Sequence, residues 1–126
     1  MTVDSQFIIS VVCEYYNQEL EDLKCNCKLR DLEFVKTRQI TMYFLREFTG
    51  MSWKRIGEVF FKDHATAMHS YRQVRNQYET YRGYRYEIDG IRSRILNYQK
   101  NEEGMSLQYY LMGIYGKQVT TQNIEI

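Results

Sequence analysis

The sequence contains no proline among its 126 residues. Proline interrupts helices more strongly than any other residue, so its absence beside many strong helix formers favours an all-α fold. The apolar run from Phe7 to Cys13 is broken by Ser10 and follows no basic segment, which argues against a secretory signal and a membrane span. With 44% hydrophobic and 26% charged residues, the composition fits a globular protein that we expect in the cytoplasm.

Two kinds of chemical site are also missing. No Gly-x-x-x-x-Gly-Lys-Ser/Thr motif occurs, so the sequence has no phosphate-binding loop for ATP. The three cysteines are an odd number, and Cys25-Asn26-Cys27 lacks the Cys-x-x-Cys spacing of zinc and thioredoxin sites. His64 and His69 do not have the i, i+4 spacing of a helical zinc pair. We therefore expect no metal, no cofactor and no enzymatic activity.

The net charge of +1 hides an uneven distribution. Residues 1–27 contain one basic and five acidic residues, and residues 28–86 contain twelve basic and six acidic ones. Residues 87–126 contain four basic and five acidic residues. A basic middle between acidic ends favours a local surface for nucleic acid over a uniformly cationic protein.

Apolar spacing and capping residues predict six helices, with a loop over most of residues 25–36. The expected N-caps are Asp4, Thr37, Ser52 and Asp63, and the expected helix-ending glycines are Gly50 and Gly83. The fifth helix should bury one stripe of side chains, namely Met68, Tyr71, Val74 and Tyr78. The helices are expected over residues 6–17, 20–24, 37–49, 52–60, 63–81 and 85–99.

The two helices that follow Ser52 form the most informative pattern. A short amphipathic helix with Ile56 and Phe60 on one side precedes an abrupt turn. The second helix then opens with three polar side chains, Asp63, His64 and Thr66. Such a helix-turn-helix places donors and acceptors at the first turn of its second helix, where they can contact base edges in the major groove. The pattern therefore predicts binding of double-stranded DNA.

Four blocks occur in the order and near the spacing of one known family. They are Glu14-Tyr15-Tyr16, Arg38-Gln39 with Met42, Leu45 and Thr49, Ser52 with Ile56-Gly57 and Phe60, and Asp63-His64-Ala65-Thr66-Ala67-Met68-His69. On these blocks, residues 7–100 resemble the C-terminal DNA-binding domain of the bacterial replication initiator family DnaA. The resemblance implies an all-α, Trp-repressor-like helix-turn-helix domain.

The resemblance also implies a role for individual residues. The start of the recognition helix would contact base edges, with His69 one turn further on: Asp63, His64, Ala65 and Thr66. A basic loop would reach the minor groove through Lys28 and Arg30. Phosphates would be contacted by Arg38, Gln39, Arg46, Trp53, Lys54 and Lys62, although Trp53 can instead lie in the core.

The turn of the motif departs from the family. Initiators commonly have Phe-Gly-Gly-Arg-Asp-His, whereas this chain has Phe60-Phe61-Lys62-Asp63-His64, which is one residue shorter and has no glycine. The turn must therefore close differently, and Phe61 can be buried or can touch the duplex. The basic loop is also diluted by Asp31 and Glu33.

Together these features predict a stand-alone DNA-binding domain over residues 1–100, without an ATPase module and linked to replication initiation or its regulation. Its expected partner is a duplex like the initiator's A/T-rich box, and no membrane partner is expected. Residues 101–126 form a tail whose aromatic stretch, residues 105–115, can pack on the helices or on a second copy of the protein. The alternative function is a protein–protein adaptor that kept the fold but not DNA recognition.

Overall fold

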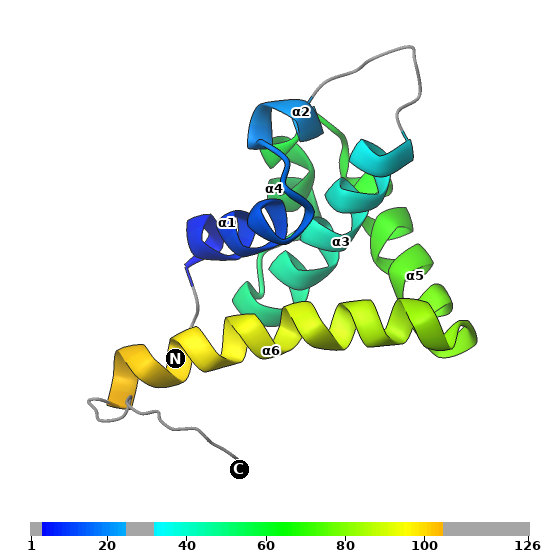
Figure 1. Ribbon diagram of the computed structural model, residues 1–126. Coiled ribbons are helices and arrows are strands. Elements are labelled where there is room, and N and C mark those ends of the chain that lie inside the picture. Colours follow the sequence, from blue (N-terminus) through cyan, green and yellow to red (C-terminus); the bar gives the residue numbers. More distant parts are fainter. Residues whose placement is uncertain (1–3, 25–31, 105–126) are drawn as a thin grey trace. The chain divides into compact units, whose positions relative to one another are not determined.

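The computed structural model describes residues 4–24 and 32–104, with side chains as far as residue 97. These residues form six helices and no strand (Figure 1), which confirms the all-α prediction. The helices are α1 (Ser5–Tyr16), α2 (Leu20–Lys24), α3 (Leu32–Thr49), α4 (Trp53–Val59), α5 (His64–Thr80) and α6 (Arg82–Gly104).

The chain divides inside α6 into two units, Met1–Arg92 and Ser93–Ile126. The first unit contains α1 to α5 and the first half of α6. Of the second unit the structure describes only the continuation of α6 to Gly104. The division into a domain of residues 1–100 and a tail stays a prediction, and the stretch 105–115 lies outside the described residues.

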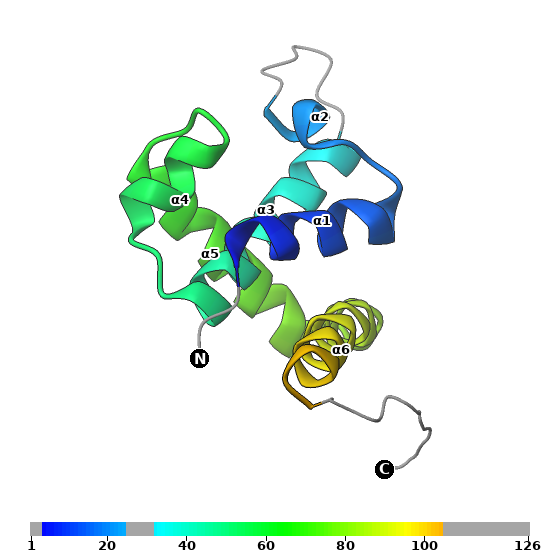
Figure 2. The ribbon, with the colours of Figure 1, turned by 90° about the vertical axis from the view of Figure 1, so that its left-hand side faces the viewer.

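Helix α3 is the centre of the first unit, because α1, α2, α4 and α5 all contact it. Figure 2 shows α3 between α1 on one side and the α4–α5 pair on the other. Six consecutive residues of α3, from Ile40 to Leu45, are buried. A helix that is buried all round its circumference must be covered on every side, which explains why four helices surround it.

Helix α3 begins five residues earlier than predicted. Thr37 does not cap it, because Thr37 is buried inside the helix and its hydroxyl donates to the carbonyl oxygen of Glu33 at 2.9 Å. The hydroxyl of Thr41 donates in the same way to the carbonyl oxygen of Thr37 at 2.8 Å. A threonine that bonds to the preceding turn is satisfied inside a helix, so it gave a false capping signal.

The predicted cap at Asp4 is in the right place but is made differently, and the predicted boundary at Gly83 was wrong. Asp4 is at the N-cap of α1, but its side chain makes no capping hydrogen bond; its backbone carbonyl accepts from Phe7 and Ile8 instead. Gly83 lies in the first turn of α6 and does not separate the helices. The separation is at Tyr81, whose extended backbone ends α5. Gly50 does adopt the left-handed conformation expected after α3, with φ of 72°.

The buried face of α5 also differs from the predicted stripe. Val74 is buried as expected, but Met68, Tyr71 and Tyr78 are only partly buried. The other two buried residues of the helix are small, Ala67 and Ser70. Small residues at a helix contact allow two backbones to approach closely, so α5 packs tightly against its neighbours near its N-terminus.

The turn between α4 and α5 depends on Gly57. The carbonyl oxygen of Gly57 accepts from the backbone N–H of Phe60 at 3.0 Å and of Lys62 at 2.9 Å. A Cβ atom at Gly57 would lie 2.6 Å from the carbonyl oxygens of both Lys62 and Asp63. Lys62 and the capping residue Asp63 can therefore pack directly against α4 only because position 57 has no side chain.

We expect Gly57→Ala to destabilise the fold, because both clashing atoms belong to the backbone and cannot rotate away. Overpacking of this kind costs about 1–3 kcal/mol. In a domain of this size the loss would lower the melting temperature by roughly 4 °C or more, measured by circular dichroism.

Gly83→Ala is the matched control, because a Cβ there would meet no atom within 4 Å. Alanine is the better helix former, so this variant should melt at the wild-type temperature or slightly above it. Equal melting temperatures for both alanine variants would show that the turn tolerates a side chain at position 57.

Candidate nucleic-acid interface

Both helices of the α4–α5 pair are capped as the sequence predicted. The Ser52 hydroxyl accepts from the backbone N–H of Arg55 at 3.2 Å at the start of α4. Oδ1 of Asp63 accepts from the backbone N–H of Thr66 at 2.8 Å at the start of α5. These bonds satisfy N–H groups that have no partner inside the helix, so they set where each helix begins.

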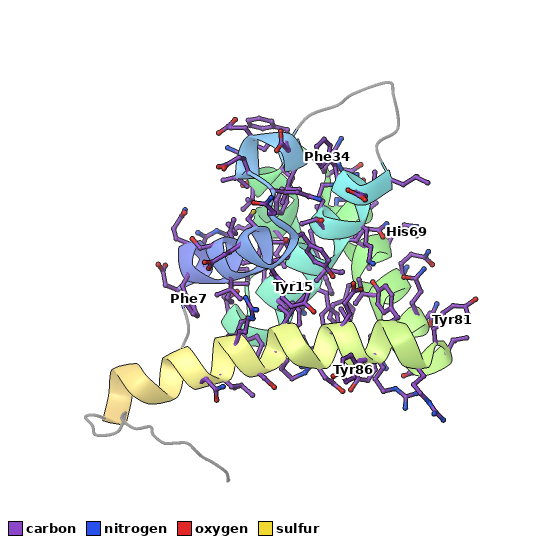
Figure 3. All side chains as sticks on the ribbon, in the orientation of Figure 1. Phe7, Tyr15, Phe34, His69, Tyr81 and Tyr86 are labelled. Atoms are coloured by element: carbon purple, nitrogen blue, oxygen red, sulfur yellow. The ribbon has the colours of Figure 1, made fainter. Side chains whose placement is uncertain are left out.

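The predicted base-contacting residues at the first turn of α5 are accessible to solvent. Asp63, His64 and Ala65 are exposed, and Thr66 is partly exposed. His69, labelled in Figure 3, is exposed one turn further along the same helix. The surface therefore offers a carboxylate, an imidazole, a methyl group and a hydroxyl, which are the groups that distinguish base edges in the major groove.

Asp63 is held in its charged form. The hydrogen bond from the backbone of Thr66 is the main cause that keeps the pKa of the Asp63 carboxyl below its ordinary value of 3.8. The position at a helix N-terminus also favours a negative charge. The backbone and the side chain of Thr66 both bond to this carboxylate, with the backbone bond on Oδ1. A carboxylate has about four acceptor positions, so it can cap α5 and still accept from a cytosine amino group.

Trp53 is half-buried, so it lies neither fully in the core nor fully at the surface. From its place at the start of α4 it contacts side chains of α3 and α5. The Arg46 guanidinium of α3 lies 4.2 Å from the centre of the Trp53 ring, and the Tyr71 ring of α5 packs edge-on at 5.3 Å. Nη1 of Arg46 also donates to the carbonyl oxygen of Met51 at 2.8 Å. Arg46 and Trp53 thus join the start of α4 to α3 and α5.

The positive charge of Arg38 on α3 acts on Lys62 in the turn between α4 and α5. Burial lowers the pKa of Arg38, and burial followed by the charge of Arg38 lowers the pKa of Lys62. Nη1 of Arg38 reaches the carbonyl oxygen of Leu23 at 3.5 Å, at the end of α2. Its Nε is buried and finds no hydrogen-bond partner within the described part of the chain. An anion placed beside this pair would relieve the repulsion.

The remaining predicted residues are distributed around the same motif. Lys54 is exposed in the first turn of α4, and Gln39 is half-buried on α3. Lys28 and Arg30 lie outside the described residues. Arg55 was not among the predicted phosphate contacts, although it is exposed beside Lys54. A second basic residue directly after a predicted phosphate contact could have indicated it.

Sequence analysis also missed Lys24. Its Nζ lies 5.3 Å from the centre of the Phe61 ring, although the two residues are 37 positions apart in the chain. No local pattern predicts such a contact, because it arises only when α2 and the turn after α4 meet in space.

The described part of the chain has neither a candidate metal site nor a helix that could span a membrane. Residues 4–24 and 32–104 contain no group of three or more His, Cys, Asp and Glu side chains that could hold a metal ion. Among the same residues, no helix is both long and apolar enough to cross a membrane.

The sequence of this motif also matches a known family. Residues 5–74, which include the whole of α1 to α4 and the exposed first turns of α5, match the family described as the bacterial DnaA protein helix-turn-helix. The chain belongs to this family. DnaA helix-turn-helix domains bind DNA and are not catalytic, and the ATPase module of the initiators is absent from these 126 residues.

Curated relatives carry the same name. The chain is 37% identical over 87 residues to the chromosomal replication initiator protein DnaA of Caldanaerobacter subterraneus subsp. tengcongensis, covering 69% of this chain and 19% of that protein. It is 36% identical over 92 residues to DnaA of Bacteroides fragilis, covering 72% of this chain and 18% of that protein. The chain thus spans about a fifth of the length of the curated relatives it matches.

The cap at Asp63 gives α5 a pH dependence with a definite sign. A carboxyl whose pKa is lower in the folded state stabilises that state above its ordinary pKa of 3.8, and the contribution is lost as the pH falls through the lower folded value. We expect Asp63→Asn to remove this dependence, because asparagine caps helices equally well but does not titrate. The measurement is the melting temperature of both proteins from about pH 7 to about pH 2.5.

The difference in melting temperature between the two proteins should stay constant down to about pH 4.5. Below that pH the wild type should lose stability relative to the variant. A difference that stays constant across the whole range would contradict a role of the ionised carboxylate in capping α5.

Proposed function

We propose that this chain binds double-stranded DNA with sequence preference by placing the first turn of α5 in the major groove. The observation that carries the proposal is the exposed group of Asp63, His64, Ala65 and Thr66 on a helix start held by the Gly57 contact. A fixed helix start matters because base contacts discriminate only when donors and acceptors are held in position.

The chemistry of these residues suggests how bases are distinguished. The Asp63 carboxylate can accept from the amino group of cytosine, and the methyl groups of Ala65 and Thr66 fit the methyl group of thymine. His64 can donate or accept a hydrogen bond, depending on its tautomer. His69 would support a contact one turn further along the groove.

Cations around the motif would bind the phosphates on either side. Lys54 lies at the exposed start of α4, and the repelling pair of Arg38 and Lys62 would be stabilised by a phosphate oxygen. Such contacts supply affinity and orientation without sequence information. Further phosphate contacts are proposed for Gln39, Arg46 and Trp53, and minor-groove contacts for Lys28 and Arg30.

The proposed target is a duplex like the A/T-rich box of the initiators, and the proposed process is replication initiation or its regulation. The relatives are named chromosomal replication initiator proteins, which supports this assignment. The site of action would be the cytoplasm, where bacterial DNA lies.

A protein–protein adaptor is the second candidate. Tyr81 is 60% exposed and Tyr86 is 83% exposed at the junction of α5 and α6, and aromatic side chains are enriched at protein interfaces (Figure 3). The first proposal requires that the start of α5 binds DNA and the second does not, so one DNA-binding experiment distinguishes them.

We expect the protein to bind a labelled box duplex more tightly than a scrambled duplex of the same length, with an affinity that falls steeply in salt. His64→Ala and Thr66→Ala should each reduce the preference between the two duplexes by about 1–3 kcal/mol. Fluorescence anisotropy at two salt concentrations measures both quantities.

Arg82→Ala is the control, since it removes a positive charge from an exposed residue at the start of α6, away from the helix-turn-helix in the sequence. Its preference for the box should equal that of the wild type. Equal binding of both duplexes by the wild type would rule out base recognition, and no binding at low salt would leave the adaptor as the better candidate.

Lys54→Ala should behave differently from the α5 variants. Loss of one phosphate contact weakens binding to both duplexes by a similar factor and lowers the slope of log affinity against log salt by about one. The preference for the box should be unchanged. A change in preference with no change in slope would assign Lys54 to the bases.

A further inference from the structure

Phe61, in the turn between α4 and α5, has an unusual backbone conformation and an exposed side chain. Its φ is 60°, in the left-handed region, and its side chain is 75% exposed. Its backbone N–H donates to the carbonyl oxygen of Glu58 at 3.2 Å, which closes the turn after α4. A large aromatic residue therefore occupies a position whose backbone favours glycine and whose side chain meets mostly water.

Neither feature helps the domain to fold. The left-handed conformation is unfavourable for any residue with a Cβ atom, and an exposed phenylalanine gains little from burial. Within the described part of the chain, the exposed Tyr81 and Tyr86 do not combine the two, since Tyr81 has φ of −114° and Tyr86 lies within the regular helix α6. Strained conformations persist most often at functional sites, so Phe61 calls for a role outside folding.

The surroundings of the ring indicate that role. Phe61 is two residues before Asp63, the cap of the proposed recognition helix. The Nζ of Lys24 lies 5.3 Å from the ring centre. The ring therefore has a cation suited to phosphate beside it, and in the sequence it comes just before a helix start suited to base edges.

We propose that the Phe61 ring is a DNA-contacting group that packs on the 5-methyl group of a thymine at the edge of the major groove. Phenylalanine makes apolar contact with this methyl group in protein–DNA complexes, and the neighbouring Lys24 would bind the adjoining phosphate. This inference rests on the proposed DNA binding, and it adds a residue of the turn to the α5 residues that determine preference.

Two variants remove the ring and keep the turn. Phe61→Gly and Phe61→Asn both place a residue in the left-handed region that tolerates it, so their melting temperatures should equal or exceed that of the wild type. Binding to the box duplex should nevertheless weaken by about tenfold, the effect of exposing roughly half of a phenylalanine ring that had been buried. Tyr86→Ala is the control, because it removes a more exposed aromatic ring and should leave the affinity unchanged.

Replacing thymine by uracil one position at a time removes only the methyl group from the duplex. The wild type should lose several-fold affinity at one position where both Phe61 variants lose none, because the ring and the methyl group contact each other. Tight binding by the Phe61 variants while His64→Ala weakens would overturn this inference and leave the proposed function standing. A wild type that does not distinguish box from scrambled duplex would overturn both.

Discussion

The contact between Gly57 and the backbone of Lys62 and Asp63 is the constraint on which the rest of the motif depends. A Cβ atom at position 57 would lie 2.6 Å from two carbonyl oxygens, so this close approach exists only for glycine. It fixes where α5 starts relative to α4, and the Asp63 cap then begins the helix at His64. The exposed first turn of α5 follows from these two local interactions, before any contact with the remaining helices.

Helix α3 holds the α4–α5 pair in place within the first unit. Its buried middle holds α1 and α2 on one side and the α4–α5 pair on the other. At its C-terminal end, the Arg46 guanidinium lies over the Trp53 ring, which also packs edge-on against Tyr71 of α5. Arg46 is also a proposed phosphate contact. A cation that is already held by an aromatic ring and by the Met51 carbonyl loses little conformational entropy when DNA binds, which favours affinity.

The sequence predicted those features that short-range chemistry determines. The caps at Ser52 and Asp63 were found because a cap needs only the residue and the next three backbone groups. The predicted cap at Thr37 was wrong because the hydroxyl of a threonine can also find a partner inside a helix. The buried stripe of α5 was predicted incorrectly because two of its buried residues are Ala67 and Ser70, which add little to a hydrophobic pattern. Contacts such as Lys24 with Phe61 depend on which helices meet, and no periodicity within one helix contains that information.

Some cations of the first unit form ion pairs between helices, and others are exposed on the helix-turn-helix. Lys36 is paired with Glu87 at 2.9 Å and Arg92 with Glu47 at 3.8 Å, so these two cations connect α3 to α6, while Arg92 also lies 4.0 Å from Asp89 within α6. Lys54 and Arg55 are exposed on α4, and Lys62 is repelled by Arg38. Lys54 and the Arg38–Lys62 pair are among the described cations proposed to bind phosphate, and such contacts add affinity without sequence information. The proposed sequence preference would come from the bases, so the geometry of the α4–α5 turn, with Gly57 buried and Phe61 exposed, would determine which sequence is chosen.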